Sequence, residues 1–131
     1  MRSFIGDIEE LTEDNRHFRR VVHTGAHMQL VLMTLEPGDE IGEEVHEDTD
    51  QFFRVEEGKG ELWSNGAVDR IERGTAIVIP AGTRHNIRNT GHAALKLYTL
   101  YAPPHHPNGT THRTKADAER GEAHAAGQAS D

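Results

Sequence analysis

The sequence predicts an all-β domain, an antiparallel sandwich or barrel, and three observations support this. Short runs of strand-like composition follow one another through most of the chain, with glycine or proline turns between them. The pair Asn65-Gly66, between two such runs, is the strongest short signal for a β-hairpin. No long helix interrupts the series, since the one helix-friendly stretch, residues 114–125, contains Gly121.

Each expected strand is apolar or alternates in polarity, and a turn signal ends it. The first strong run ends at Pro37-Gly38, and the last ends at Pro103-Pro104. Residues 5–12 are expected to form a further strand, an N-terminal arm that covers an edge of its own barrel or of a twin subunit. We therefore expect a homodimer. The other predicted strands are residues 18–23, 28–35, 51–55, 61–64, 68–71, 76–79, 85–89 and 95–101.

The 131 residues suit one domain with one core. From about Pro103 onward, Pro, Gly, Ala, His and Thr dominate and the apolar periodicity is lost. We therefore expect a single barrel with its arm at residues 1–102, and a partly mobile Pro/His-rich tail at residues 103–131. The tail histidines have no spacing that fixes a metal geometry. They are His105, His106 and His112.

Composition excludes several functions. The formal net charge of −8 argues against a nucleic-acid partner. No apolar run approaches the roughly 20 residues of a membrane span, and the N-terminus lacks the features of a secretion signal, so we expect a cytoplasmic protein. The chain has no cysteine, and any metal must be held by nitrogen and oxygen ligands.

Strand alternation predicts which polar side chains face the interior. Gln51 shares a face with apolar Phe53, and His85 shares a face with Ile87. Buried polar groups without a partner cost about 1–3 kcal/mol each, and one cation would satisfy a whole group of them. The side chains expected to converge in this way are Glu44, His46, Gln51 and His85.

The spacing of these residues resembles the first motif of the cupins, G-x5-H-x-H-x(3,4)-E-x6-G. Gly38 is followed after five residues by Glu44-Val45-His46, after four more by Gln51, and after six more by Gly58. The resemblance implies a jelly-roll barrel, the double-stranded β-helix, with a metal inside it.

The second cupin motif, G-x5-P-x-G-x2-H-x3-N, is matched at every fixed position. The matching residues are Gly74, Pro80, Gly82, His85 and Asn89.

Two positions depart from the cupin pattern. Glu44 stands where a cupin usually has its first histidine, and Gln51 stands where it has glutamate. The two exchanges preserve one negative charge in the site, which favours a retained metal centre. Mixed imidazole and oxygen ligation suits one divalent ion of Mn, Fe, Co, Ni, Cu or Zn. In one alternative, His46 and Asp48 form the H-x-H element. In another, Glu44 lies at the barrel mouth and the other three are merely buried polar groups.

Cupins include dioxygenases, decarboxylases, lyases and sugar isomerases, and short members are often labelled mannose-6-phosphate-isomerase-like. The resemblance implies a small metalloenzyme that acts on a small oxygen-bearing metabolite at a mononuclear metal. The alternative is a non-catalytic cupin that binds a sugar or small metabolite around a structural metal. The sequence identifies no general base beyond the ligand carboxylate.

A phosphosugar substrate is less expected, because a phosphate group requires an inward-facing cation. The arginines beside the predicted ligands have the opposite strand parity, and the remaining candidates are Arg19, Arg20 and Lys96. The outward arginines are Arg54, Arg84 and Arg88.

Overall fold

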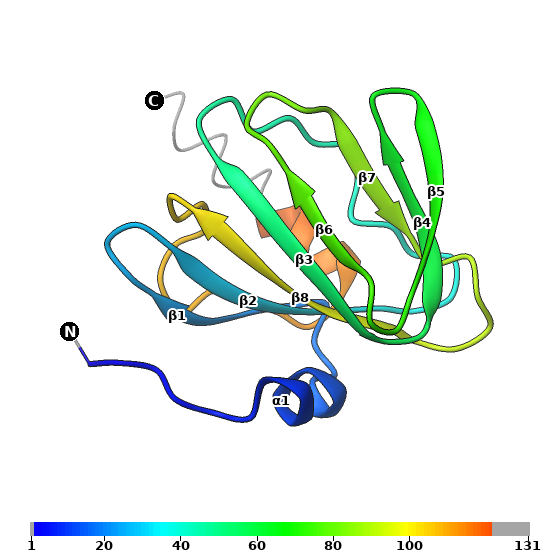
Figure 1. Ribbon diagram of the computed structural model, residues 1–131. Coiled ribbons are helices and arrows are strands. Elements are labelled where there is room, and N and C mark those ends of the chain that lie inside the picture. The colour runs from blue at the N-terminus through cyan, green and yellow to red at the C-terminus, as the bar shows by residue number, and fades with distance from the viewer. Residues whose placement is uncertain (1, 122–131) are drawn as a thin grey trace.

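The computed structural model describes residues 2–121 as two antiparallel β-sheets that face each other (Figure 1). The larger sheet has six strands in the order β6-β3-β8-β2-β1-β9, and the smaller has three in the order β5-β4-β7. No helix within residues 2–121 is long and apolar enough to cross a membrane. The strands are β1 (Arg19–Thr24), β2 (Gln29–Leu35), β3 (Asp50–Glu57), β4 (Lys59–Ser64), β5 (Ala67–Glu72), β6 (Ala76–Ile79), β7 (His85–Arg88), β8 (Leu95–Ala102) and β9 (Thr111–His112).

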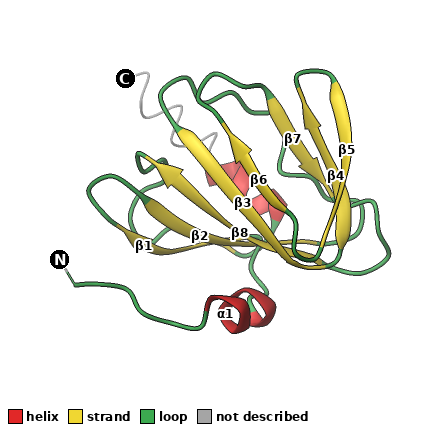
Figure 2. Cartoon of the chain, viewed as in Figure 1, coloured by secondary structure: helices red, strands yellow, loops and turns green. Residues whose placement is uncertain are grey.

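The predicted all-β fold is confirmed, and strands make up most of the described chain (Figure 2). Each strand expected between residues 18 and 101 is present, and β6 begins and ends where the sequence places it. The Asn65-Gly66 turn joins β4 to β5, and both residues have positive φ angles, as this turn type requires.

The hydrophobic core lies between the two sheets. Inner faces follow the alternation of each strand: β3 buries Phe53 and Val55, β7 buries Ile87, and β8 buries Leu95 and Leu97. The polar side chains that share these inner faces are therefore held inside the barrel, as the sequence predicts.

The N-terminal arm contains a helix, and the expected strand at residues 5–12 was wrong. The helix α1 (Ile8–Asp14) begins at Asp7, whose Oδ1 accepts a hydrogen bond from the Glu10 N–H at 3.1 Å. Two acidic residues in the first turn also complement the partial positive charge of a helix start. Local capping therefore outweighs the weak alternation of this segment.

The segment after β8 packs back onto the barrel. Strand β9 pairs with β1 and so extends the larger sheet. Residues 115–121 are helical, and Lys115 Nζ donates a hydrogen bond to the Ile41 carbonyl at 2.7 Å. The rest of the predicted tail lies outside the described residues.

Candidate metal centre

A backbone bridge joins the two segments that carry the predicted ligands. Glu44 and His85 exchange hydrogen bonds: the Glu44 N–H donates to the His85 carbonyl at 2.9 Å, and the His85 N–H donates to the Glu44 carbonyl at 3.0 Å. Asn86 also holds the loop, since its Oδ1 accepts from the Gly42 N–H at 2.9 Å. Residues directly opposite in an antiparallel pair place their side chains on one face, so these contacts bring the two side chains together.

Other motif residues have structural roles. Gly58 has a φ of +91°, and a Cβ there would lie 2.4 Å from the Ala94 carbonyl oxygen, so only glycine fits. The Asn89 side-chain amide donates to the carbonyls of Leu35 and Ala93, each at 2.9 Å. Asn89 thus links the end of β2 to the segment before β8, and we assign it no ligand role.

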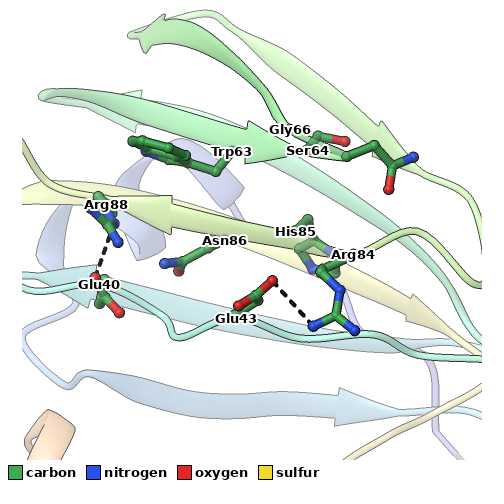
Figure 3. Close-up of a pocket in the computed structure, with 10 residues that line it drawn as sticks. Glu40, Glu43, Trp63, Ser64, Gly66, Arg84, His85, Asn86 and Arg88 are labelled. Carbon is green, nitrogen blue, oxygen red and sulfur yellow. Dashed lines mark hydrogen bonds and ion pairs between the residues drawn. The ribbon is translucent and has the colours of Figure 1, made fainter.

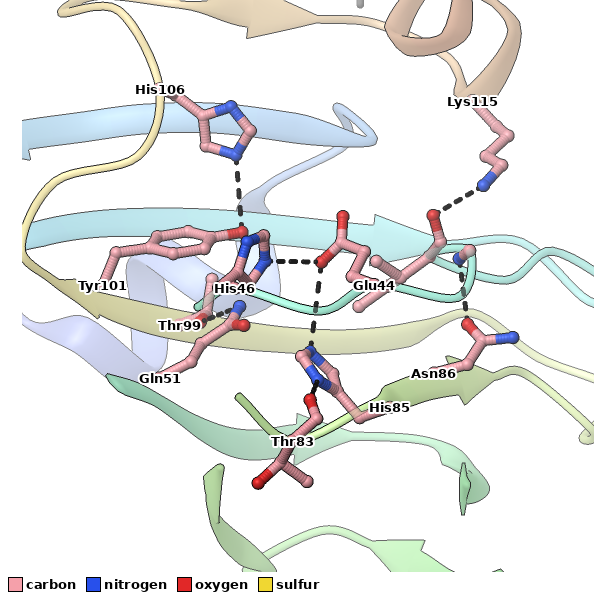
Figure 4. Close-up of polar contacts among 12 residues, drawn as sticks. Glu44, His46, Gln51, Thr83, His85, Asn86, Thr99, Tyr101, His106 and Lys115 are labelled. Atoms are coloured by element: carbon pink, nitrogen blue, oxygen red, sulfur yellow. Dashed lines mark hydrogen bonds and ion pairs between the residues drawn. The ribbon is translucent and has the colours of Figure 1, made fainter. Parts of the chain in front are cut away.

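Three of the predicted ligands meet (Figure 4). Glu44 Oε2 lies 3.0 Å from His46 Nε2 and 3.9 Å from His85 Nε2. One ligand atom from each residue lies within 4.8 Å of the other two, so this group could hold a metal ion. Asp48 is exposed, which argues against the alternative register that pairs it with His46.

Gln51, the fourth predicted ligand, is buried on the inner face of β3 at 2% exposure. Its Nε2 donates a hydrogen bond to Thr99 Oγ1 at 3.0 Å. Figure 4 shows its side chain extending from β3 toward the group formed by Glu44, His46 and His85. No printed distance joins its Oε1 to the other three, and its role as a ligand stays a prediction.

Glu44 is held as a carboxylate. Burial raises the pKa of Glu44, but the hydrogen bond to His46 and the charges of His46, Arg19 and His85 more than offset this. The net pKa of Glu44 therefore lies below its usual value of 4.5. An ionised carboxylate beside two imidazoles is a donor set that suits a divalent transition-metal cation.

Two buried atoms of the site fit a cation. Within the part of the chain that the structure describes, His85 Nε2 and Gln51 Oε1 have no hydrogen-bond partner. His85 Nδ1 lies 3.0 Å from the Thr83 carbonyl, which can only accept, so the neutral form of the ring carries its proton on Nδ1 and presents a lone pair on Nε2. The site thus offers nitrogen and oxygen atoms of the types that bind metals, and two of these atoms have lone pairs that accept no hydrogen bond within the described residues.

Two of the three arginines expected to face outward, Arg84 and Arg88, pair with acidic residues away from the ligand group. Arg84 pairs with Glu43 at 3.2 Å, and Arg88 pairs with Glu40 at 3.0 Å and lies over the Trp63 ring. These side chains line a second cavity of about 260 Å³ on the smaller sheet, and His85 borders that cavity as well (Figure 3).

Arg19 is buried, so the barrel does contain a cation whose charge acts on Glu44. Its side chain is 1% exposed, and its positive charge lowers the pKa of Glu44. Arg20 is exposed, and Lys96 donates to the Glu13 and Asn15 carbonyls at the end of α1. The sequence identified Arg19 as a candidate but could not show its burial, because strand parity alone leaves open which face of β1 is covered.

Sequence reasoning missed the residues that the C-terminal segment brings to the site. The His105 ring lies 4.4 Å from the His46 ring, between centroids, and stacks on Tyr101 at 5.3 Å. His106 Nε2 lies 3.3 Å from the Tyr101 hydroxyl. The available signal was the adjacent pair of histidines after Pro103-Pro104, but nothing local indicates that the chain folds back there.

Known proteins share this architecture. Residues 31–101 match the family model described as a cupin domain. The Bacillus subtilis protein YrkC is 46% identical over 123 residues, which are 89% of this chain and 66% of YrkC. The chain thus spans about two thirds of the length of this curated relative.

Solved structures agree. The crystal structure of BH2720 from Bacillus halodurans has a TM-score of 0.89 and 48% identity, and the match covers 91% of this chain and 95% of that one. A cupin-superfamily sugar phosphate isomerase from Silicibacter pomeroyi has a TM-score of 0.55 and 23% identity, over 60% of this chain and 52% of that one, which bears on the fold alone. The barrel, its paired motifs and these matches together show that the chain belongs to the cupin family.

Proposed function

We propose that this protein binds one divalent transition-metal ion through Glu44, His46, Gln51 and His85. The observation that carries the proposal is the pair of buried lone pairs, His85 Nε2 and Gln51 Oε1, that have no hydrogen-bond partner among the described residues. Leaving such atoms unsatisfied costs about 1–3 kcal/mol each. A cation between them and the Glu44 carboxylate removes that cost.

Neighbouring groups support the proposal by fixing the ligand atoms. The Thr83 carbonyl holds the His85 tautomer, and Thr99 holds the Gln51 amide by accepting from its NH₂ group. Partners of this kind orient metal ligands in characterised sites and raise their affinity. The Glu44–His46 contact at 3.0 Å is the hydrogen bond that metal binding would replace.

The proposed activity is that of a small metalloenzyme for an oxygen-bearing metabolite. A bound metal would supply Lewis-acid polarisation of a substrate oxygen. The chain's own residues bind and orient the substrate: Glu44 lines a cavity of about 400 Å³, a size typical of small-molecule sites. A phosphosugar isomerase has less support, because none of the described residues that line this cavity is a lysine or arginine.

Metal analysis tests the proposal. The untagged protein, purified without chelator, is expected to contain or take up one equivalent of Mn, Fe, Co, Ni, Cu or Zn. A protein that carries no metal and takes up none of these ions would contradict it. A metal-loaded protein that binds metabolites but turns none over would instead support a non-catalytic binding role.

A further inference from the structure

The second cavity, on the smaller sheet, is lined by residues of β4, of β7 and of the loop that precedes Glu44 (Figure 3). Its volume of about 260 Å³ is below the roughly 300–1,000 Å³ of sites for drug-sized ligands, so it suits a single small ring. Of the four proposed metal ligands, His85 alone is among the described residues that line it. The side chains that give this cavity its chemistry are Glu40, Glu43, Trp63, Arg84, Asn86 and Arg88.

Asn86 presents an oriented hydrogen-bond donor to this cavity. The residue is only 5% exposed, and its Oδ1 accepts a hydrogen bond from the Gly42 N–H at 2.9 Å. Because an N–H can only donate, this bond fixes which end of the amide is the oxygen. The NH₂ group at the other end has no hydrogen-bond partner among the described residues, and Figure 3 shows the amide between the Trp63 ring and the loop that carries Glu40. A ligand oxygen in the cavity would therefore gain a hydrogen bond from a group that is already held in place.

The charges of the cavity lining cancel one another. Arg84 Nη1 lies 3.2 Å from Glu43 Oε1, and Arg88 Nε lies 3.0 Å from Glu40 Oε2. A charged ligand would have to separate one of these ion pairs or approach a like charge, whereas a neutral ligand leaves both pairs intact. Each ion pair uses one oxygen of its carboxylate, and the second oxygen remains able to accept a hydrogen bond. The lining therefore favours an uncharged ligand that can also donate hydrogen bonds.

Trp63 adds an apolar surface next to this donor. It is the direct partner of Asn86 across β4 and β7, so the two side chains lie on the same face of the sheet. The Arg88 guanidinium lies over the ring, 4.8 Å from its centroid, yet Trp63 remains 37% exposed. An apolar ligand surface that packs on the uncovered part of the ring would be removed from water.

We infer that this cavity binds a neutral cyclic polyol of the size of one monosaccharide, with Asn86 and Trp63 as its contact residues. A hydroxyl group both donates and accepts, so a ring of hydroxyls can accept from the Asn86 amide and donate to the carboxylates of Glu40 and Glu43. The C–H groups of such a ring form an apolar face that suits Trp63. None of these contacts involves the proposed metal ion, so this site goes beyond the proposed function and does not depend on it.

The fluorescence of Trp63 tests the inference, because it is the one tryptophan of the chain. The full chain is titrated with glucose, mannose and galactose, and with tetrahydropyran as a ring of similar size without hydroxyl groups. We expect at least one hexose to change the emission with a millimolar Kd, the range that a ligand of this size reaches. Tetrahydropyran should cause no change. The amino-sugar and uronic-acid counterparts of that hexose should bind about tenfold more weakly, because each brings a charge.

Two variants locate the binding site. Asn86→Asp keeps the oxygen that accepts from the Gly42 N–H but removes the NH₂ donor, and hexose affinity should fall about tenfold. Asn108→Asp makes the same change at an exposed loop position and should leave affinity unchanged. Trp63→Ala removes the apolar surface and should also weaken binding about tenfold, measured by saturation-transfer NMR because the fluorescent reporter is lost. It keeps the test decisive if Asn86→Asp does not fold.

Titrations of the metal-free and the Co²⁺-treated protein separate this site from the metal centre. We expect the same hexose affinity in both, and a protein that takes up no Co²⁺ would contradict the proposed function alone. No binding of any of the three hexoses would overturn the inference, and so would equal hexose affinity in the wild type and both cavity variants. Binding that requires Co²⁺ and is unchanged in Asn86→Asp would place the sugar at the metal centre instead. Tighter binding of a charged counterpart would overturn the assignment of a neutral ligand.

Discussion

Glu44 and His85 are direct partners across an antiparallel bridge, and their side chains meet 3.9 Å apart inside the barrel. The two residues are distant in sequence, yet reciprocal backbone hydrogen bonds fix their relative position. The backbone thus fixes the positions from which the Glu44 and His85 side chains extend. Sites built on paired strands are preorganised, which favours tight and selective binding.

Removing either imidazole should abolish tight metal binding. His46→Ala and His85→Ala each delete one ligand, and we expect a loss of affinity of at least about 100-fold, beyond the 10–100-fold typical of outer-shell changes. Metal titration with a competing chelator measures this. His27→Ala, at an exposed turn, is the matched control and should retain wild-type affinity. Unchanged affinity in both ligand variants would refute the assignment.

The negative charge of Glu44 should contribute to metal affinity. Glu44→Gln keeps the shape of the side chain but removes the one anion of the proposed ligand set, so metal affinity should fall on the order of tenfold or more. Glu47→Gln, an exposed neighbour in the same loop, serves as the control. If both variants bind metal like the wild type, Glu44 is a bystander.

Thr99 provides a test of Gln51 that leaves every proposed ligand in place. Thr99→Val removes the hydroxyl that accepts from the Gln51 amide, and it leaves that buried NH₂ group unsatisfied at a cost of about 1–3 kcal/mol. We expect weaker metal binding, about tenfold, as for other groups that orient ligands. The exposed Thr90→Val is the control. Weaker folding with undiminished metal affinity would show that Gln51 is a structural residue only.

His106 should make the metal-free protein less stable in acid. The unfolded chain protonates this histidine near its usual pKa of 6.5, whereas the folded protein keeps the pKa at about 2. The unfolded state therefore binds more protons in this window, and the free energy of unfolding falls as the pH drops below about 6.5. The charged and titratable groups around the ring are Arg19, His46, His105 and His112.

The loss reaches up to about 2 kcal/mol between pH 7 and pH 5 for this one group. His106→Asn should flatten the dependence by that amount in urea unfolding measured at both values. His92→Asn, which replaces an exposed histidine, should leave the slope unchanged. An identical slope in the wild type and His106→Asn would contradict the prediction.

The inner face of the barrel could be predicted from the sequence because strand alternation is local. Gln51 with Phe53, and His85 with Ile87, were each assigned to the interior by parity, and all four are buried. The spacing of the two motifs then identified which polar side chains would meet. The structure brings together Glu44, His46 and His85.

Other features depend on contacts that the sequence does not display. Strand β9 is only two residues long and exists because it pairs with β1. The burial of Arg19 depends on the C-terminal segment that passes over it, and His112 from that segment contacts its guanidinium. By contrast, the N-cap bond from the Glu10 N–H to Asp7 is a local feature, and the helix that it starts replaces the strand expected at residues 5–12.

X-ray absorption spectroscopy of the metal-loaded protein gives the most direct test of the central claim. Two imidazole nitrogens and oxygen donors at roughly 2.0–2.2 Å from one ion are expected, with the histidine scattering reduced in both His46→Ala and His85→Ala. A spectrum with oxygen neighbours alone, unchanged by either substitution, would mean that the metal binds elsewhere and that the barrel interior is not the site.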